Sequence, residues 1–457
     1  MSGSGLSRSS SGIEFVLDGS PYQAYTYSYP HKSAYRVLES PIPLTQAWER
    51  EDKRALFLYL HVPFCEHRCG FCNLFTQANP EVGLTTRYLN QLECEASVVG
   101  ESLGKGVHFA QIAIGGGTPT FLNRAELQRL LQISSSIGAD CRRLPLSVEV
   151  SPATLDHDKL NLLAEYQTDR ISIGIQSFRE DEARRLGRPQ KAADVHKALS
   201  GIRRVGFPVL NIDLIYGGEG QSVSDWLACV QEAIRWNPEE LYLYPLYVRP
   251  LTGLGRLDHS WDDQRLEAYR EARDVLLGSG YEQTSMRMFR RSSAGMANRD
   301  PAGRSSGEHQ YQCQDDGMIG LGCGARSYTT QLHYSTEFAV GRQGVRGILS
   351  DYLNRKTDSF ALAHYGIQLS LDDQKRRFAI LSLLQTCGLS RIHYQQRFRS
   401  DVIIDFPQLN SLVEHALAQM SAEYLRLTPQ GIERSDAIGP WLYSSHIRGL
   451  MQSFELV

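Results

Sequence analysis

The chain carries LYLHVPFCEHRCGFCN at residues 58–73, a segment that places Cys65, Cys69 and Cys72 in a C-x3-C-x2-C spacing. Three thiolates on one tight loop suit three irons of a [4Fe–4S] cluster and leave the fourth iron open to a small molecule. The alternative is a zinc knuckle or a set of buried thiols, but zinc sites use four ligands, usually from two separated cysteine pairs. The spacing therefore favours an iron–sulfur cluster with three protein ligands.

The composition is that of an ordinary globular protein. The chain has 457 residues, 42% hydrophobic and 22% charged, and no run approaches the ~18 apolar residues of a membrane span. The formal net charge is -3, from 48 basic and 51 acidic residues, which provides no surface for a polyanion. We therefore expect a cytoplasmic protein with neither nucleic-acid nor membrane partners, and nine cysteines without regular spacing fit a reducing compartment.

Six short apolar runs, each followed by a polar, amphipathic stretch, predict repeated β/α units. The runs begin near residues 55, 110, 146, 170, 209 and 241. Strand then helix, six times, predicts a parallel sheet in a partial (β/α)6 TIM-like barrel, where functional groups gather at the carboxyl ends of the strands. The cysteine loop, the GGGTP segment at 115–119, Glu149, Gln176 and Asp213 all follow or end such runs.

The pattern changes after the barrel. From about residue 371 it becomes helical and ends in a hairpin-like turn, which predicts a winged-helix-like domain; residues 360–457 hold nine basic and nine acidic side chains, against a DNA-binding role. We expect a disordered tail over 1–12, an N-terminal arm over the site at 13–52, the barrel with its closing segment at 53–357, and a mostly helical C-terminal domain at 358–457.

Further motifs follow the cysteines in a fixed order. Phe71 precedes the last cysteine, and IAIGGGTPTFL, SVEVSP, ISIGIQSF and NIDLIYG begin at residues 112, 147, 171 and 211. This series resembles the radical S-adenosylmethionine (SAM) superfamily and, within it, the HemN-like family of oxygen-independent coproporphyrinogen III oxidases. The resemblance implies a [4Fe–4S] cluster, SAM cleaved to a 5′-deoxyadenosyl radical, and an electron donor of flavodoxin or ferredoxin type.

The resemblance also implies which residues surround two SAM molecules. Around the first we expect Tyr59, Gly116 and Glu149, whose carboxylate would accept hydrogen bonds from ribose hydroxyls. Around the second we expect Phe71, Gly117, Thr118, Gln176, Arg188 and Asp213. Two further positions differ from the oxidases, with Tyr247 in place of a small residue at the second SAM and Arg326 in place of an aliphatic one at the first. His61 and His67 are candidates for proton transfer.

Other differences from the oxidases concern the reaction. Leu74 occupies the place where those enzymes typically carry another cysteine, and YTYSYPHKSAYR at 25–36 resembles class C radical SAM methylases and, most closely, the radical component of duocarmycin-type cyclopropanases. This resemblance implies transfer of a methylene or methyl unit to an sp2 carbon of a small-molecule natural product in antibiotic biosynthesis, with cyclopropanation as one outcome and a methyltransferase-like partner for ring closure. An oxygen-independent coproporphyrinogen III oxidase, another haem-related radical SAM enzyme, and a haem or cluster carrier without turnover are the alternatives.

Overall fold

The computed structural model describes residues 12–256, 264–291 and 311–456, and within them two compact units. The larger unit comprises Lys32–Glu282, Phe289–Leu369 and Ser453–Val457, and the smaller comprises Met1–His31, Gln283–Met288 and Ser370–Gln452. Residues 1–11, which hold nearly all of the predicted tail, lie outside the described residues. The other predicted domain boundaries stay predictions.

Six parallel strands form the centre of the larger unit, in the sheet order β2-β5-β6-β7-β8-β9. They are β2 (Leu56–Val62), β5 (Phe109–Gly116), β6 (Leu146–Val150), β7 (Arg170–Gln176), β8 (Val209–Tyr216) and β9 (Glu240–Pro245). Neighbours in sequence are neighbours in the sheet, as in a β/α barrel. The partial (β/α)6 barrel predicted from the apolar runs is confirmed.

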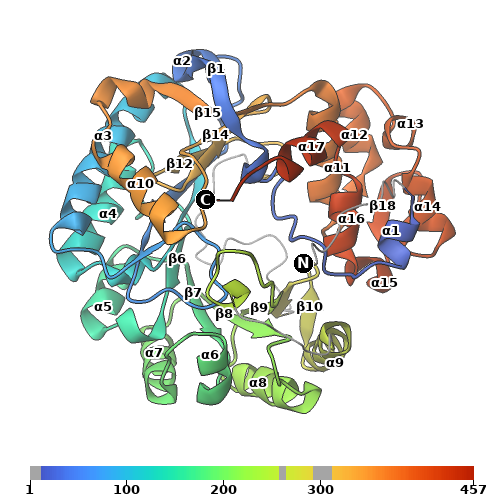
Figure 1. The fold of residues 1–457 in the computed structure, drawn as a ribbon, viewed down its shortest axis with the longest axis horizontal. Coiled ribbons are helices and arrows are strands. Elements are labelled where there is room, and N and C mark those ends of the chain that lie inside the picture. The colour runs from blue at the N-terminus through green and yellow to red at the C-terminus, as the bar shows by residue number, and fades with distance from the viewer. Residues whose placement is uncertain (1–11, 257–263, 292–310, 457) are drawn as a thin grey trace. The chain divides into compact units, whose positions relative to one another are not determined.

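Helices cover the outer side of the curved sheet (Figure 1). They include α3 (Leu84–Leu103), α4 (Arg124–Ser136), α5 (His157–Glu165), α6 (Glu180–Arg185), α7 (Ala192–Val205), α8 (Val223–Arg235) and α9 (Arg265–Gly278). The buried side of α3 repeats every three or four residues, from Leu84 to Leu103, which is the spacing of one helix face. Its neighbour α4 begins at a capping box between Asn123 and Glu126.

The sheet continues beyond both edges of the barrel. On one side β12 (Met318–Leu321) pairs in parallel with β2, followed by β13 (Arg326–Tyr328), β14 (Leu332–Ser335), β15 (Leu362–Gln368) and β1 (Arg36–Pro43). On the other side lie β11 (Met288–Arg291) and β10 (Tyr281–Gln283). The shorter elements of this unit are η1 (Lys32–Ala34), α2 (Leu44–Ala47), η2 (Pro119–Phe121), η3 (Pro152–Thr154), η4 (Leu254–Arg256), α10 (Arg342–Leu353) and η5 (Thr357–Ala361).

The smaller unit is mostly helical, as predicted for the C-terminal region. Its helices are α1 (Glu14–Leu17), α11 (Leu371–Leu383), α12 (Arg391–Phe398), α13 (Val402–Asp405), α14 (Leu409–Glu414), α15 (Pro429–Ile432), α16 (Ser435–Trp441) and α17 (Ser445–Gln452). A small antiparallel sheet joins them, in the order β16 (Leu389–Ser390), β18 (Tyr424–Leu427), β17 (Ala418–Met420). Among the described residues, no helix has the length and apolarity needed to cross a membrane.

Candidate functional site

The three predicted cluster ligands lie on the loop that follows β2. The loop begins at β3 (Phe64–Cys65) and returns at β4 (Gln77–Ala78), and these two short strands pair in parallel. A turn within it is closed by the N–H of Cys72, which donates to the carbonyl of Cys69 at 3.2 Å. None of the three cysteines is in a disulfide and each residue is partly exposed, so the thiols are available to a shared ligand, although those of Cys65 and Cys72 are largely surrounded by protein.

Main-chain contacts fix the middle of this loop. The N–H of Gly70 donates to the carbonyl of Leu186 at 3.0 Å, and the N–H of Leu254 donates to the carbonyl of Gly70 at 2.8 Å. A Cβ at position 70 would lie 2.9 Å from the Leu186 oxygen, so only glycine allows this approach. The loop is therefore held by two segments that are distant from it in sequence, one at Leu186 and one at Leu254.

The chemistry of the three thiols fits an iron–sulfur cluster. Burial raises the pKa of Cys65 to about 12, and burial together with neighbouring Cys69 raises that of Cys72. Bound iron would favour the thiolates and offset this cost. Among the described residues, no three His, Cys, Asp or Glu side chains form a site for a single metal ion. In a cluster each thiolate binds a different iron, which suits three thiols spread along one loop.

The end of β5 brings two predicted SAM contacts together. The N–H of Gly116 donates to Oε2 of Glu149 at 3.0 Å, and the Glu149 carboxyl lies where a side chain at Gly115 would be. Glu149 is an exposed residue near the carboxyl end of β6, but the protein around it displaces part of its bulk water and so raises its pKa to about 7; the nearby Asp213 adds to this effect. Near neutral pH its carboxyl can therefore donate or accept a hydrogen bond.

His61 is packed too tightly to transfer protons to a substrate. Its ring lies against the end of β5, where a Cβ on Gly116 would be 2.5 Å away. Nε2 lies 3.0 Å from the carbonyl of Phe75, and Nδ1 lies 3.2 Å from the hydroxyl of Tyr59. Burial lowers the pKa of His61 to about 4, so the ring is neutral. Nε2–H then donates to Phe75, and Tyr59 donates to Nδ1, which fixes the direction of the Tyr59 hydroxyl.

Asp213 lies in a polar group inside the barrel. Its Oδ1 accepts from Nδ2 of Asn211 at 2.8 Å, and its Oδ2 accepts from the hydroxyl of Ser172 on β7 at 3.2 Å. Burial raises the pKa of Asp213, while Arg170 opposes that rise. Both carboxylate oxygens are therefore held in a fixed direction at the inner face of β7 and β8.

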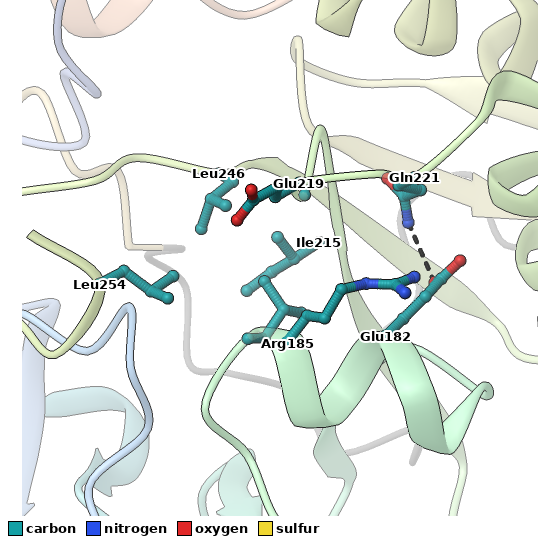
Figure 2. A pocket seen from close by; sticks show the side chains of 9 residues that line it. Glu182, Arg185, Ile215, Glu219, Gln221, Leu246 and Leu254 are labelled. Atoms are coloured by element: carbon teal, nitrogen blue, oxygen red, sulfur yellow. Dashed lines mark hydrogen bonds between the residues drawn. The ribbon is translucent and has the colours of Figure 1, made fainter. Parts of the chain in front are cut away.

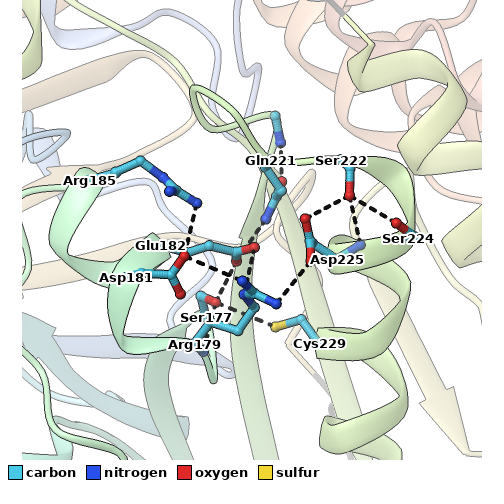
Figure 3. A network of polar contacts seen from close by, with 11 residues as sticks. Ser177, Arg179, Asp181, Glu182, Arg185, Gln221, Ser222, Ser224, Asp225 and Cys229 are labelled. Carbon is cyan, nitrogen blue, oxygen red and sulfur yellow. Dashed lines mark hydrogen bonds and ion pairs between the residues drawn. The ribbon is translucent and has the colours of Figure 1, made fainter.

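The carboxyl ends of β7 and β8 are shaped by an irregular strand and a polar network. Gln176 has a φ of 69°, uncommon for a side chain of this size, where the β7–β8 register shifts. Behind it, Oε2 of Glu182 accepts from Ser177 at 2.6 Å and from Gln221 at 3.1 Å, which joins the segments after the two strands (Figure 3). This network fixes the backbone that carries Gln176.

The other predicted residues lie around these groups. Gly117 and Thr118 follow β5 beside Cys65, and a Cβ on Gly117 would be 3.0 Å from its sulfur. Arg188 lies next to Cys69, with Nη1 at 3.4 Å from the sulfur. Tyr247 lies two residues past the end of β9, and Arg326 begins β13.

Phe71 packs on an apolar cluster at the same end of the barrel. The cluster consists of Leu186, Ile215, Leu246 and Leu254. These residues also line a small pocket, together with Arg185 and Glu219 (Figure 2). The cavity of about 20 Å³ has room for one water molecule, so it does not hold SAM or a substrate.

Sequence reasoning missed three groups that support the site. Asn211 and Ser172 orient Asp213, and Glu182 joins the two strand ends. The signal for Asn211 was present, because it alternates with Asp213 along an otherwise apolar strand and must share its face. Glu182 carried no comparable signal, since it lies in a charged helical segment.

Comparison with known proteins agrees with this geometry. Residues 59–233 match the family described as the radical SAM superfamily. The chain is 30% identical to the oxygen-independent coproporphyrinogen III oxidase of Paracoccus denitrificans over 396 residues, covering 82% of this chain and 84% of that protein. It is 28% identical to the heme chaperone HemW of Bacillus subtilis over 384 residues, covering 82% of this chain and 95% of that protein.

A solved structure shows the same fold. Coproporphyrinogen III oxidase (HemN) from Escherichia coli matches with a TM-score of 0.78 at 24% identity, over 92% of this chain and 96% of that one. The family implies a [4Fe–4S] cluster and SAM as cofactors, and the three thiols at the strand ends fit that requirement.

These relatives overturn the predicted reaction. The prediction of methylene or methyl transfer to a natural product was wrong. The chain instead matches an oxidase and a haem chaperone, and each match covers most of the relative's length. The predicted closeness to the duocarmycin-type cyclopropanases has no support either. The methyltransferase-like partner was predicted from that resemblance alone, so it has no support. The alternative haem-related functions agree better with the relatives.

Proposed function

The chain belongs to the HemN-like family of the radical SAM superfamily, and on this premise we propose that it is an oxygen-independent oxidase of a porphyrinogen, such as coproporphyrinogen III. One observation carries the proposal: three free thiols on a loop held beside the strand end where Gly116 contacts Glu149. The extent of the similarity to the oxidases supports the class of substrate.

Different residues of the chain have different roles in such a site. Cys65, Cys69 and Cys72 would hold the cluster, which together with SAM would supply the radical chemistry that starts the reaction at a substrate carbon. Glu149 accepts hydrogen bonds from the ribose, and Gly116 lets the bound molecule approach the main chain. Tyr59 presents its oxygen as an acceptor, because its proton is directed to His61. The substrate propionate then loses CO2 and one electron to an acceptor and becomes a vinyl group.

We further propose two SAM molecules and a low-potential protein donor. Asp213 supports a second molecule, because both of its oxygens are oriented at the inner face of the barrel. The partly exposed cysteine loop supports electron entry from a flavodoxin or ferredoxin.

A defined reaction tests the proposal. Anaerobically reconstituted protein is mixed with dithionite, SAM, coproporphyrinogen III and a one-electron acceptor, and porphyrins, CO2 and 5′-deoxyadenosine are measured. We expect CO2 and 5′-deoxyadenosine in equal amounts, and neither from Cys69→Ser. SAM cleavage that does not respond to the porphyrinogen, with no CO2, would reject the oxidase.

A haem carrier is the second candidate. The heme chaperone HemW of Bacillus subtilis matches over 95% of its length, and Leu74, which is 52% exposed, takes the place of a cysteine typical of the oxidases. Stoichiometric haem binding by the reconstituted protein, measured by absorbance without any loss of CO2 from coproporphyrinogen III, would favour this carrier over the oxidase.

A further inference from the structure

Each of the three predicted cluster ligands lies within hydrogen-bond distance of one polar side chain; Thr118 and Arg188 are distant in sequence, and Thr76 belongs to the cysteine loop itself. The pairs are Cys65 with Thr118 at 3.5 Å, Cys69 with Arg188 at 3.4 Å, and Cys72 with Thr76 at 3.8 Å. Two donors are neutral hydroxyls, and the third is a guanidinium. Among these three groups only Arg188 is charged, and its hydrogen bond goes to the sulfur of Cys69, while Arg68 acts on the sulfur of Cys72 through its charge alone.

We propose that Arg188 sets the reduction potential of the cluster through its hydrogen bond to Cys69. A reduced cluster carries one more negative charge than an oxidised one, so a nearby cation and N–H donor stabilise the reduced form more. Arg188 therefore makes the potential more positive and the cluster easier to reduce. This role of Arg188 concerns the reduction of the cluster, so it does not depend on which substrate the enzyme oxidises.

The other donors of Arg188 hold the guanidinium in this position. Nη2 donates to the carbonyl of Gly174 at 2.7 Å and to the hydroxyl of Ser151 at 3.2 Å, and Nε donates to Oε1 of Gln190 at 3.0 Å. Gln190 is held in turn by the carbonyl of Ile175 at 3.0 Å. Four of the five N–H groups are thus used within the chain. A bidentate contact with the carboxylate of a second SAM would have to displace one of them.

The backbone before Arg188 explains why it reaches the cysteine loop. The carbonyl of Leu186 accepts from the N–H of Gly70, directly after Cys69. Gly187 then turns the chain with a φ of 67°, and a Cβ there would lie 2.7 Å from the nitrogen of Gly70. Residues 186–188 therefore contact Cys69 and Gly70 of the loop, which brings the guanidinium within hydrogen-bond distance of the Cys69 sulfur.

A redox titration tests this role. We would reconstitute the full chain and measure the midpoint potential of the cluster from its EPR signal, without SAM or porphyrinogen. Arg188→Met, which removes the charge and the donors, is expected to give a more negative midpoint than the wild type. Arg188→Lys, which keeps the charge but loses the planar donor geometry, is expected to give a smaller shift in the same direction. Arg185→Met is the matched control, because that arginine lies nearby, is 43% exposed and pairs with Asp181.

The outcomes separate this role from SAM binding. Midpoints of both Arg188 variants equal to that of Arg185→Met, at four irons per chain, would overturn the proposal. The same result with less SAM bound per chain would assign Arg188 to the second SAM instead. If Arg188→Met fails to keep its cluster, Arg188→Lys carries the test alone. The porphyrinogen assay is a separate measurement, so a failed oxidase proposal does not affect this result.

Discussion

The main-chain N–H of Gly116 and the carboxyl of Glu149 are 3.0 Å apart, although 33 residues separate them in sequence. They meet because β5 and β6 are neighbouring parallel strands whose carboxyl ends lie at one edge of the sheet. An exposed carboxyl with a raised pKa, beside glycine backbone at the end of two neighbouring strands, is typical of a ligand site.

Replacing Glu149 by glutamine is expected to weaken SAM binding while stabilising the protein without SAM. A hydrogen bond to a charged group is worth about 1.5–3 kcal/mol, so the dissociation constant should rise roughly tenfold to hundredfold. The folded pKa of about 7 lies above the unfolded value of 4.5, so the wild type loses stability as the pH rises from 4.5 to about 7 and loses no more above it. Glu149→Gln should therefore melt higher than the wild type at pH 8 and equally at pH 4.

Calorimetry with SAM and thermal melts at both pH values check this. Glu165→Gln is the control, because Glu165 is 56% exposed on the outer helix α5. A Glu149→Gln protein that binds SAM as tightly as the wild type would remove Glu149 from the site.

The buried imidazole of His61 is expected to make the protein sensitive to acid. Its pKa of about 4 lies below the unfolded value of about 6.5, so stability is present above pH 6.5 and falls as the pH drops toward 4. The loss for a shift of this size is about 3 kcal/mol. His61→Gln should show a smaller loss between pH 6.5 and 4 in denaturant titrations. A loss equal to that of the wild type, with His157→Gln as the surface control, would contradict the neutral ring.

Removing the amide of Asn211 is expected to disturb Asp213. In Asn211→Leu, Oδ1 of Asp213 loses the donor at 2.8 Å while the carboxyl stays partly buried. With the two SAM molecules proposed above, we expect the number bound per chain to fall from two toward one, measured by equilibrium dialysis with labelled SAM. Ser172→Ala, which removes the longer bond of 3.2 Å, should have a smaller effect. Unchanged SAM binding in both variants would argue against a second molecule at Asp213.

Adding a methyl group at Gly187 is expected to displace the cluster loop. Gly187→Ala would strain the backbone at φ 67° and push a Cβ against Gly70. Gly206 is a matched control, since it ends α7 with a φ of 80° and has open space around it. Both substitutions should cost about 1–2 kcal/mol of backbone strain. Iron and sulfide per chain should fall in Gly187→Ala alone, and equal contents in the two variants would contradict the packing.

Much of the barrel could be predicted because its parallel strands are buried on both sides and appear in the sequence as apolar runs. Polar residues that interrupt or end such runs, such as Glu149 and Asp213, marked the site for the same reason. The packing of His61 could not be predicted, because it depends on the backbone of Gly116 on another strand. The contact of Arg188 with Cys69 depends in the same way on the positive φ of Gly187.

The predicted reaction failed for a different reason. Tyr247, Arg326 and Leu74 are single differences within a fold that the whole chain shares with the oxidases, and such differences say less about the reaction than the similarity of the whole chain. A side chain at one position changes which molecule fits, but it does not identify that molecule.

The cluster loop is gripped at Gly70 through peptide groups, one on Leu186 and one on Leu254. Peptide groups are the same for every amino acid, so the anchorage does not depend on the side chains at 66, 67 and 73. Substitutions at those positions would therefore alter the surface of the loop without removing the two main-chain bonds that hold it beside the strand ends.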